Sequence, residues 1–275
     1  MHRPTSEFPV VARAGVEMIR PMARIGSAFF GGIGVRVMFL RDIFRAFREP
    51  STWGPLVVPQ MRAIGVDSLP LAAMVAAFIG GVIALQVRYQ LFPGIQLSVV
   101  GLSARQMVVL ELGPLLTGLV LTGRVGARMT AEIGTMRVTE QIDALETLAY
   151  DPVAYLVVPR LIAGIVMLPL LVIMANAVGV ASGLVTALLA TDVTMPVFKE
   201  GVRLGFTEFQ VWYSLIKATM FGAAIAFLCT FEGYTTEAGA EGVGRSTASA
   251  VVLTSVAILI LDALTALFLA PYLAP

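Results

Sequence analysis

Hydrophobic and polar positions alternate along this chain in long blocks. Five blocks are almost wholly apolar, at residues 69–87, 107–123, 161–190, 211–231 and 250–270. At about 1.5 Å per residue, each is long enough to cross most or all of a hydrocarbon core about 30 Å thick as a helix. A helix also satisfies its own backbone polar groups, which lipid cannot do. The pattern therefore predicts an all-α membrane protein with five transmembrane helices. The third block is the longest, which predicts tilt, a kink at Pro169 or an extension beyond the membrane.

The composition supports this fold class and limits the chemistry. Of 275 residues, 57% are hydrophobic and only 13% are charged, whereas soluble domains carry about 25% charged residues. The single histidine, His2, leaves this chain without a histidine metal site or a Ser-His-Asp nucleophile. The single cysteine, Cys229, is expected to be a small buried side chain. We expect no enzyme, no cofactor, no metal and no nucleic-acid partner, and no secretory signal before residue 30.

Arginine and lysine are distributed unequally between the two sides that five spans define. Residues 1–68 hold nine, the segment 124–160 holds four and the segment 232–249 holds one, against four in the segments on the opposite side. By the positive-inside rule, the amino terminus and the 124–160 segment are expected in the cytoplasm and the carboxyl terminus outside.

The first sixty residues differ from the rest because arginines are interleaved with large apolar side chains. Such a mixture is typical of helices that lie in the headgroup plane, with arginines toward anionic lipid. We expect residues 1–62 to form an interfacial elbow and residues 63–275 to form the five-helix transmembrane domain. The alternative is a sixth, re-entrant span near 25–40, which Arg36 and the Gly31-Gly32-x-Gly34 cluster disfavour.

One acidic segment, TEQIDALETLAYDP (139–152), separates the second apolar block from the third. As a helix it would place its carboxylates on one face and its apolar side chains on the opposite one. The acidic face would comprise Glu140, Asp143 and Glu146, and the apolar face Ile142, Leu145, Leu148 and Ala149. Asp151 before Pro152 is expected to end the helix. Two interpretations remain open: a solvated amphipathic loop helix, or a short lever through which a partner pushes on both flanking spans.

Three spans each carry one ionisable residue, Glu111, Lys217 and Asp262. A charge at the centre of a span costs a few kcal/mol, so these side chains are expected to face protein or water. The span directions place all three in the middle or the outer half of the membrane, as though they lined a cavity that opens outward. They could pair as interhelical links, contact phospholipid headgroups, or relay protons.

Small residues recur at spacings that allow helices to approach closely in lipid, as in Gly80-Gly81, Gly179-x-x-x-Gly183 and Gly222-Ala223. The glycine-rich segment 237–245 lacks the G-x-x-x-x-G-K-[ST] order of a phosphate-binding loop. The chain is therefore expected to draw energy from an ATPase on another chain, or from an ion gradient.

Two long segments resemble a known family. The segment ELGPLLTGLVLTGRVGARMTAEIGTMRVTEQIDALETLAYDPVAYLVVPRLIAG (111–164) resembles the signature region of MlaE-type permeases of ABC lipid transporters. The segment FEGYTTEAGAEGVGRSTASAVVLTSVAILILD (231–262) resembles their carboxyl-terminal signature. Together they cover about a third of the chain. One departure is Leu110, where the family commonly has a basic residue before the glutamate.

The resemblance implies a homodimeric permease in the bacterial inner membrane that moves phospholipid to or from a periplasmic partner. It implies that 134–151 is a coupling helix, with Glu140, Asp143, Glu146 and Asp151 facing a cytoplasmic ABC ATPase dimer that binds the ATP. It also implies a periplasmic hexamer of MCE-domain subunits and a small regulatory subunit of the STAS type. The substrate cavity would be lined by Glu111, Lys217 and Asp262. The alternatives are an ion-gradient-driven secondary transporter that uses the same three residues, and a structural scaffold.

Overall fold

The computed structural model describes residues 34–237 and 239–273. It divides into two compact units, Met1–Arg45 and Ala46–Pro275. The described residues contain no strand, and residues 34–46 are helical. Most of the expected interfacial elbow lies outside the described residues.

The expected domain boundary at residue 62 falls inside a helix of the larger unit, α2 (Pro50–Ile64). This helix leads through a short 3₁₀ turn, Val66–Ser68, directly into the first long apolar helix. Residues 50–62, the last part of the expected elbow, therefore lead almost without a break into the first span.

Five helical runs of the described chain are long and apolar enough to cross a membrane. They are Pro50–Gln90, Ser98–Val138, Val153–Ala190, Glu208–Tyr234 and Ala240–Leu273. This confirms the predicted all-α membrane protein with five spans. Every run is longer than its apolar block, because the helices continue past the hydrophobic residues into polar sequence at their ends.

The second run is divided by two π-helical segments. It comprises α4 (Ser98–Gln106), the π segment η2 (Met107–Leu112), α5 (Gly113–Leu121), the π segment η3 (Thr122–Gly126) and α6 (Ala127–Val138). The remaining elements are α3 (Leu69–Gln90), α7 (Gln141–Thr147), the π segment η4 (Val153–Val157), α8 (Val158–Ala190), α9 (Met195–Arg203), α10 (Glu208–Tyr234), α11 (Ala240–Leu269) and the 3₁₀ turn η5 (Ala270–Leu273).

The longest helix, α8, has 33 residues, which gives it a length of about 50 Å at 1.5 Å per residue. This length exceeds a hydrocarbon core of about 30 Å. Helix α8 therefore extends beyond the core, which is one of the three outcomes expected from the length of its apolar block. Pro169 lies inside the helix, and Pro159 lies near its start, directly after the π segment that precedes it.

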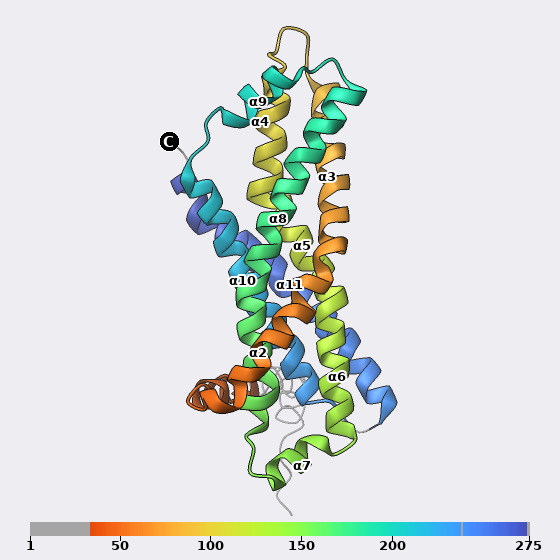
Figure 1. Cartoon of the computed structure of the whole chain (residues 1–275), viewed down its shortest axis with the longest axis vertical. Helices are drawn as coiled ribbons and strands as arrows, with labels where there is room; N and C mark the ends of the chain where they lie inside the picture. Colours follow the sequence, from red (N-terminus) through yellow and green to blue (C-terminus); the bar gives the residue numbers. More distant parts are fainter. Residues whose placement is uncertain (1–33, 238, 274–275) are drawn as a thin grey trace, which may run out of the picture. The chain divides into compact units, whose positions relative to one another are not determined.

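Helix α8 is central to the larger unit, since it packs against α3, α10 and α2, while α10 packs in turn against α11 and α6. The short helix α7 lies at one end of this unit and α9, packed on α4, at the other (Figure 1). Toward the end that carries α9, the amino end of α10 and the carboxyl end of α11 diverge from α8 (Figure 1). One face of α8 is therefore left without α10 against it at that end.

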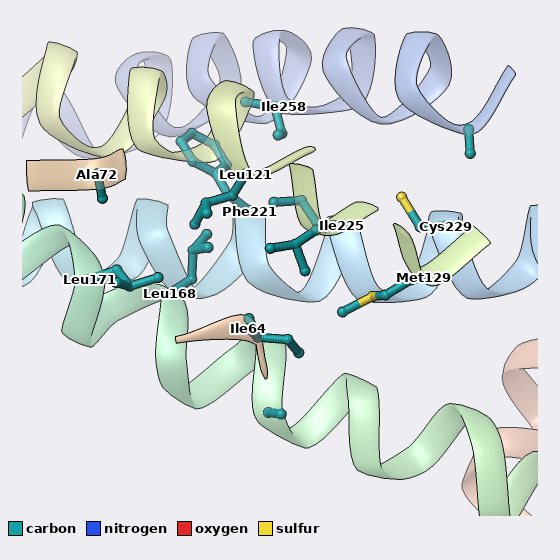
Figure 2. Close-up of a cluster of buried hydrophobic side chains, with 13 residues drawn as sticks. Ile64, Ala72, Leu121, Met129, Leu168, Leu171, Phe221, Ile225, Cys229 and Ile258 are labelled. Atoms are coloured by element: carbon teal, nitrogen blue, oxygen red, sulfur yellow. The ribbon is translucent and has the colours of Figure 1, made fainter. Parts of the chain in front are cut away.

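An apolar core joins the spans in the middle of the bundle. Leu121, Phe221 and Ile258 are fully buried or nearly so, and come from three different spans (Figure 2). Cys229 is a free, buried cysteine in the same cluster, with its Sγ 3.5 Å from the Thr254 hydroxyl. It is thus the small buried side chain that was expected.

Glycines let the central helices touch through their backbones. A Cβ at Gly80 of α3 would collide with the Gly179 carbonyl of α8, and a Cβ at Gly222 of α10 would collide with the Gly164 carbonyl. In lipid no hydrophobic driving force brings helices together, so they associate through close packing of this kind.

Replacing Gly80 by valine is expected to destabilise the fold by about 3 kcal/mol or more, because the new side chain meets rigid backbone of α8 and the helices must separate. Thermal unfolding of the purified protein in detergent measures the effect. The control is Gly54→Val in α2, where a Cβ meets nothing within 4 Å. Equal melting temperatures for the two variants would contradict this packing argument.

Candidate functional site

Three charged side chains from three spans meet within the membrane-spanning part of the chain. The Lys217 ammonium of α10 lies 2.7 Å from a carboxylate oxygen of Glu111 in η2 and 2.7 Å from one of Asp262 in α11. The lysine side chain is fully buried, and 12% of the Asp262 side chain is exposed, whereas 43% of the Glu111 side chain is exposed. The structure thus brings together all three ionisable residues that the sequence singled out.

The backbone around Glu111 also contributes to this cluster. Pro114 has no N–H to donate to the Leu110 carbonyl four residues earlier, and the Lys217 Nζ lies 3.4 Å from that carbonyl oxygen. Glu111 itself lies in the π segment Met107–Leu112. Such bulges are frequent at functional sites because they redirect side chains on a helix. At the position where the family commonly has a basic residue, Leu110 thus supplies a carbonyl acceptor.

An aromatic ring completes the surroundings of the ammonium. The ring centroid of Tyr213, one turn before Lys217 on α10, is 4.9 Å from Nζ, within the range of a cation–π contact. Tyr213 is itself almost fully buried. With two carboxylates, a carbonyl and a ring around one buried cation, loss of the cation would leave the carboxylates uncompensated, which is costly.

A polar pair lies beside the cluster, and the sequence analysis missed it. The Asn176 side-chain nitrogen of α8 donates to the Ser214 hydroxyl at 3.0 Å, and Ser214 lies three residues before Lys217. An asparagine within the long apolar block 161–190 was the signal that could have indicated it, since polar side chains in spans commonly pair with another helix.

The acidic segment forms a shorter helix than expected. Within 134–151, α6 continues to Val138, the chain turns at Glu140 with φ 58°, and α7 covers only Gln141–Thr147. A second residue with positive φ, Ala149 at 62°, follows α7. A left-handed conformation is uncommon for residues other than glycine, so the periodicity of the sequence could not predict these breaks.

Glu140, Asp143 and Glu146 are all exposed at this end of the bundle. Asp143 accepts a hydrogen bond from Arg137 at 2.8 Å. The expected apolar face is smaller than predicted, because Ile142 is fully buried whereas Leu148 and Ala149 are exposed.

The expectation that Asp151 ends the acidic helix was wrong. The acidic helix α7 ends earlier, at Thr147, and Ala149 after it has a left-handed backbone conformation. Asp151 instead accepts a hydrogen bond from the Val153 backbone N–H at 2.9 Å, so its carboxylate caps the start of the third helical run.

A second ionic cluster joins the two spans that flank α7. Glu132 of α6 accepts from Arg128 at 2.7 Å and from the buried Arg160 of α8 at 3.2 Å. Arg160 also donates to the Leu156 carbonyl at 2.7 Å. The sequence analysis counted these arginines only as surface charge. Glu132 fixes α6 to α8 close to the connection that carries α7.

Replacing Glu132 by glutamine should lower the stability by about 3 kcal/mol, because the buried Arg160 loses its only carboxylate partner among the described residues. Arg128→Gln is the matched control. Its side chain is 57% exposed, so its loss should cost about 1 kcal/mol at most. Thermal unfolding of both variants in detergent compares them, and a larger effect for Arg128→Gln would contradict the assignment of Glu132 as an interhelical link.

Polar contacts also fix the opposite end of the larger unit. The Arg88 guanidinium donates two hydrogen bonds to Asp192, at 2.5 and 2.6 Å. These bonds hold the pKa of the Asp192 carboxyl below its ordinary value. The stabilisation is therefore present at neutral pH and is lost as the pH falls through that lowered pKa. The buried Arg105 of α4 donates to Gln210 and to the Leu204 carbonyl.

Across the described ranges, no group of three or more histidine, cysteine, aspartate or glutamate side chains is arranged to hold a metal ion. The intramembrane cluster offers a buried ammonium and two carboxylates, of which Glu111 is the more exposed.

Five spans with a charged cluster between three of them define a multi-pass membrane protein. Comparison with known proteins specifies the class further. The family described as Permease MlaE matches residues 57–268, and the chain belongs to this family.

Individual relatives agree with the family assignment. A probable ABC transporter permease of Rickettsia prowazekii is 40% identical over 236 residues, covering 84% of this chain and 90% of the relative. The intermembrane phospholipid transport system permease protein MlaE of Haemophilus influenzae is 31% identical, covering 90% of this chain and 91% of the relative. The chloroplast protein trigalactosyldiacylglycerol 1 of Arabidopsis thaliana is 33% identical, covering 84% of this chain and 66% of the relative. The chain is thus a permease of the ABC transporter type.

Proposed function

We propose that this chain is the transmembrane permease subunit of an ABC transporter that moves phospholipid between the inner membrane and a periplasmic MCE-domain partner. A separate ATPase subunit supplies the energy. The observation that carries the proposal is the ionic cluster of Lys217, Glu111 and Asp262 inside the spans of an MlaE family member. The name of the Haemophilus relative, a permease of an intermembrane phospholipid transport system, supports phospholipid as the substrate.

The end that carries α7 is proposed to face the cytoplasm and the end that carries α9 the periplasm. The distribution of arginine and lysine supports this orientation. The amino terminus then lies in the cytoplasm and the carboxyl terminus in the periplasm. Lys217 lies in the first half of α10, so the cluster is nearer the end proposed to be periplasmic.

Helix α7 is proposed to be the coupling helix that docks on the ATPase. The exposed carboxylates of Asp143 and Glu146 in α7, and of Glu140 directly before it, offer the ATPase a charged surface. The flanking spans begin and end within a few residues of α7 and are linked by Glu132 and Arg160, so a displacement of α7 would act on both spans together.

The exposed part of the Glu111 carboxylate is proposed to line the substrate cavity. Lys217 and Asp262 set the charge of the cavity wall at that point. A carboxylate whose side chain is 43% exposed can hydrogen bond to a headgroup while its other contacts remain within the protein. A second copy of the chain, the ATPase dimer, an MCE-domain hexamer and a STAS-type regulatory subunit complete the proposed complex.

Purification of the tagged chain from its native membranes in mild detergent tests this proposal. We expect a P-loop ATPase and an MCE-domain protein to co-purify with it in fixed ratio. A chain that purifies without either of them, and that moves phospholipid between liposomes unaided, would refute the proposed function.

A further inference from the structure

Arg105 of α4 is a buried cation that has no acidic partner. Only 3% of the residue is exposed, and it forms no ion pair with any residue of the described ranges. Its acceptors are neutral oxygens, that of the Gln210 side chain and that of the Leu204 carbonyl, the latter at 2.9 Å. Its Nε has no hydrogen-bond partner in the described part of the chain. A buried charge without an opposite charge costs stability, so a contact that served stability alone would not need this residue.

The contacts of Arg105 fix the connection between α9 and α10, residues 204–207. The guanidinium carbon lies 5.5 Å from the centre of the Phe206 ring, within the range of a cation–π contact. Gln210 holds the same connection, since its side-chain nitrogen donates to the Gly205 carbonyl at 3.0 Å. Gly205 has φ 60°, which glycine adopts without strain. The connection is therefore folded around the guanidinium.

Helix α4 is itself packed tightly against α9. A Cβ at Gly101 would collide with the Phe198 carbonyl, and a Cβ at Gly201 would collide with the Ser98 carbonyl. The two helices thus touch through their backbones at two points, as closely packed helices in lipid do. Arg105 extends this rigid pair onto the first turn of α10, because Gln210 is the third residue of that helix.

Helix α10 is therefore attached to the second helical run, Ser98–Val138, at two places. Gln210 contacts Arg105, and Lys217 contacts Glu111. These two residues of α10 are seven positions apart, so they face the same side of the helix and are separated by about 10 Å. Lys217 bonds to two carboxylates, whereas Arg105 bonds only to neutral oxygens, which are weaker acceptors. The attachment at Arg105 is the easier of the two to release.

The attachment at Arg105 lies where α10 departs from α8. Further along, the two helices are in backbone contact through Gly164 and Gly222. Toward the end of the bundle that carries α9, the amino end of α10 diverges from α8 (Figure 1). A helix that is fixed along its length and held apart only at one end can pivot when the contact at that end is released.

From these contacts we propose that Arg105, Leu204 and Gln210 form a latch that holds the amino end of α10 apart from α8 and must release for lipid transfer. Release lets the first turns of α10 move toward α8, while the attachment at Lys217 stays closed. Arg105 is thus a positioning residue that acts through α10. The neutral acceptors keep the latch weak enough to open, which accounts for the missing carboxylate. The inference rests on the proposed function for its effect on lipid transfer.

The variant Gln210→Glu tests the latch by strengthening it. A carboxylate supplies the missing negative charge and a further acceptor for the free Nε. The Gly205 carbonyl loses its donor, but Gly205 is exposed, so water can replace it. The variant should raise the melting temperature in detergent and slow ATP-driven lipid transfer by the purified complex roughly 10-fold. Gln96→Glu, at an exposed position just before α4, is the matched control and should change neither.

Spin labels measure the movement itself. The label sites are Leu189→Cys near the end of α8 and Trp212→Cys near the start of α10, both at exposed positions, and Cys229 is buried and does not compete for the label. In the chain alone, diluted with unlabelled chain, Arg105→Gln should add a shorter distance that the wild type lacks. In the complex, a non-hydrolysable ATP analogue should shorten the wild-type distance and leave that of Gln210→Glu unchanged.

Two results would overturn the latch. The first is a Gln210→Glu complex that transfers lipid as fast as the wild type, since a contact that only stabilises the fold would raise the melting temperature without slowing transfer. The second is the same label distance in wild type and Arg105→Gln. A wild-type complex that transfers no lipid would contradict the proposed function instead, and the distances in the chain alone would still decide the latch.

Discussion

Reversing two charges at α7, in the variant Glu140→Lys/Glu146→Lys, should weaken binding of the ATPase by roughly 10- to 100-fold, as expected when charged groups of a docked interface are reversed. The five spans should still insert and fold, because neither carboxylate forms an ion pair within the described chain. Glu140 has φ 58°, and lysine adopts that conformation at about the same cost as glutamate. Co-purification of the P-loop ATPase with the tagged variant, quantified against the wild type, measures the loss.

A matched control changes the same amount of charge at the same end of the bundle. Glu237→Lys/Glu241→Lys alters two exposed acids before and within the start of α11, where Glu237 has only an exposed bridge to Arg245 at 3.3 Å. This control should retain the ATPase. Undiminished ATPase binding by the α7 variant would contradict the coupling role of α7. Equal loss in both variants would show that the total charge at this end, and not α7 itself, governs binding of the ATPase.

Replacing Lys217 by methionine should destabilise the chain by about 3–5 kcal/mol, because Glu111 and Asp262 then face each other without the buried ammonium that both contact at 2.7 Å. Lys217→Arg keeps the charge and should lose less. The triple variant Glu111→Gln/Lys217→Met/Asp262→Asn removes every charge together and should recover most of the stability. Thermal unfolding in detergent and the yield in membranes measure these differences.

The same triple variant separates the two roles left open for the cluster. If Glu111 contacts phospholipid headgroups, the triple variant should fail to transfer lipid although it folds stably. Full transfer by the triple variant would reduce the cluster to an interhelical link. A wild-type melting temperature for Lys217→Met alone would contradict even that structural role.

Much of the fold could be predicted from the sequence, because it depends on local patterns of apolar and polar residues. Long apolar blocks fix the five spans, because only a helix satisfies its backbone in lipid. The meeting of Glu111, Lys217 and Asp262 was also predictable in outline, since each charge must avoid lipid and all three lie at similar depth. The sequence could not predict which of the three is buried and which is exposed. The structure shows that Lys217 is fully buried and that Glu111 is the most exposed.

The features that the sequence did not reveal depend on conformation or on distant partners. The π segment at Met107–Leu112 contacts α8 and α10, which lie far away along the chain, and the positive φ values at Glu140 and Ala149 have no glycine to indicate them. The link from Glu132 to Arg160 joins residues 28 positions apart, so periodicity within one helix gives no sign of it.

The central claim is that a separate ATPase drives phospholipid through this chain. Proteoliposomes that hold the purified complex and a fluorescent phospholipid, with an acceptor for the lipid outside, test it most directly. We expect transfer with ATP, no transfer with a non-hydrolysable analogue, and none when the chain is reconstituted alone. Transfer by the chain alone, or transfer that follows an imposed pH gradient without ATP, would contradict it.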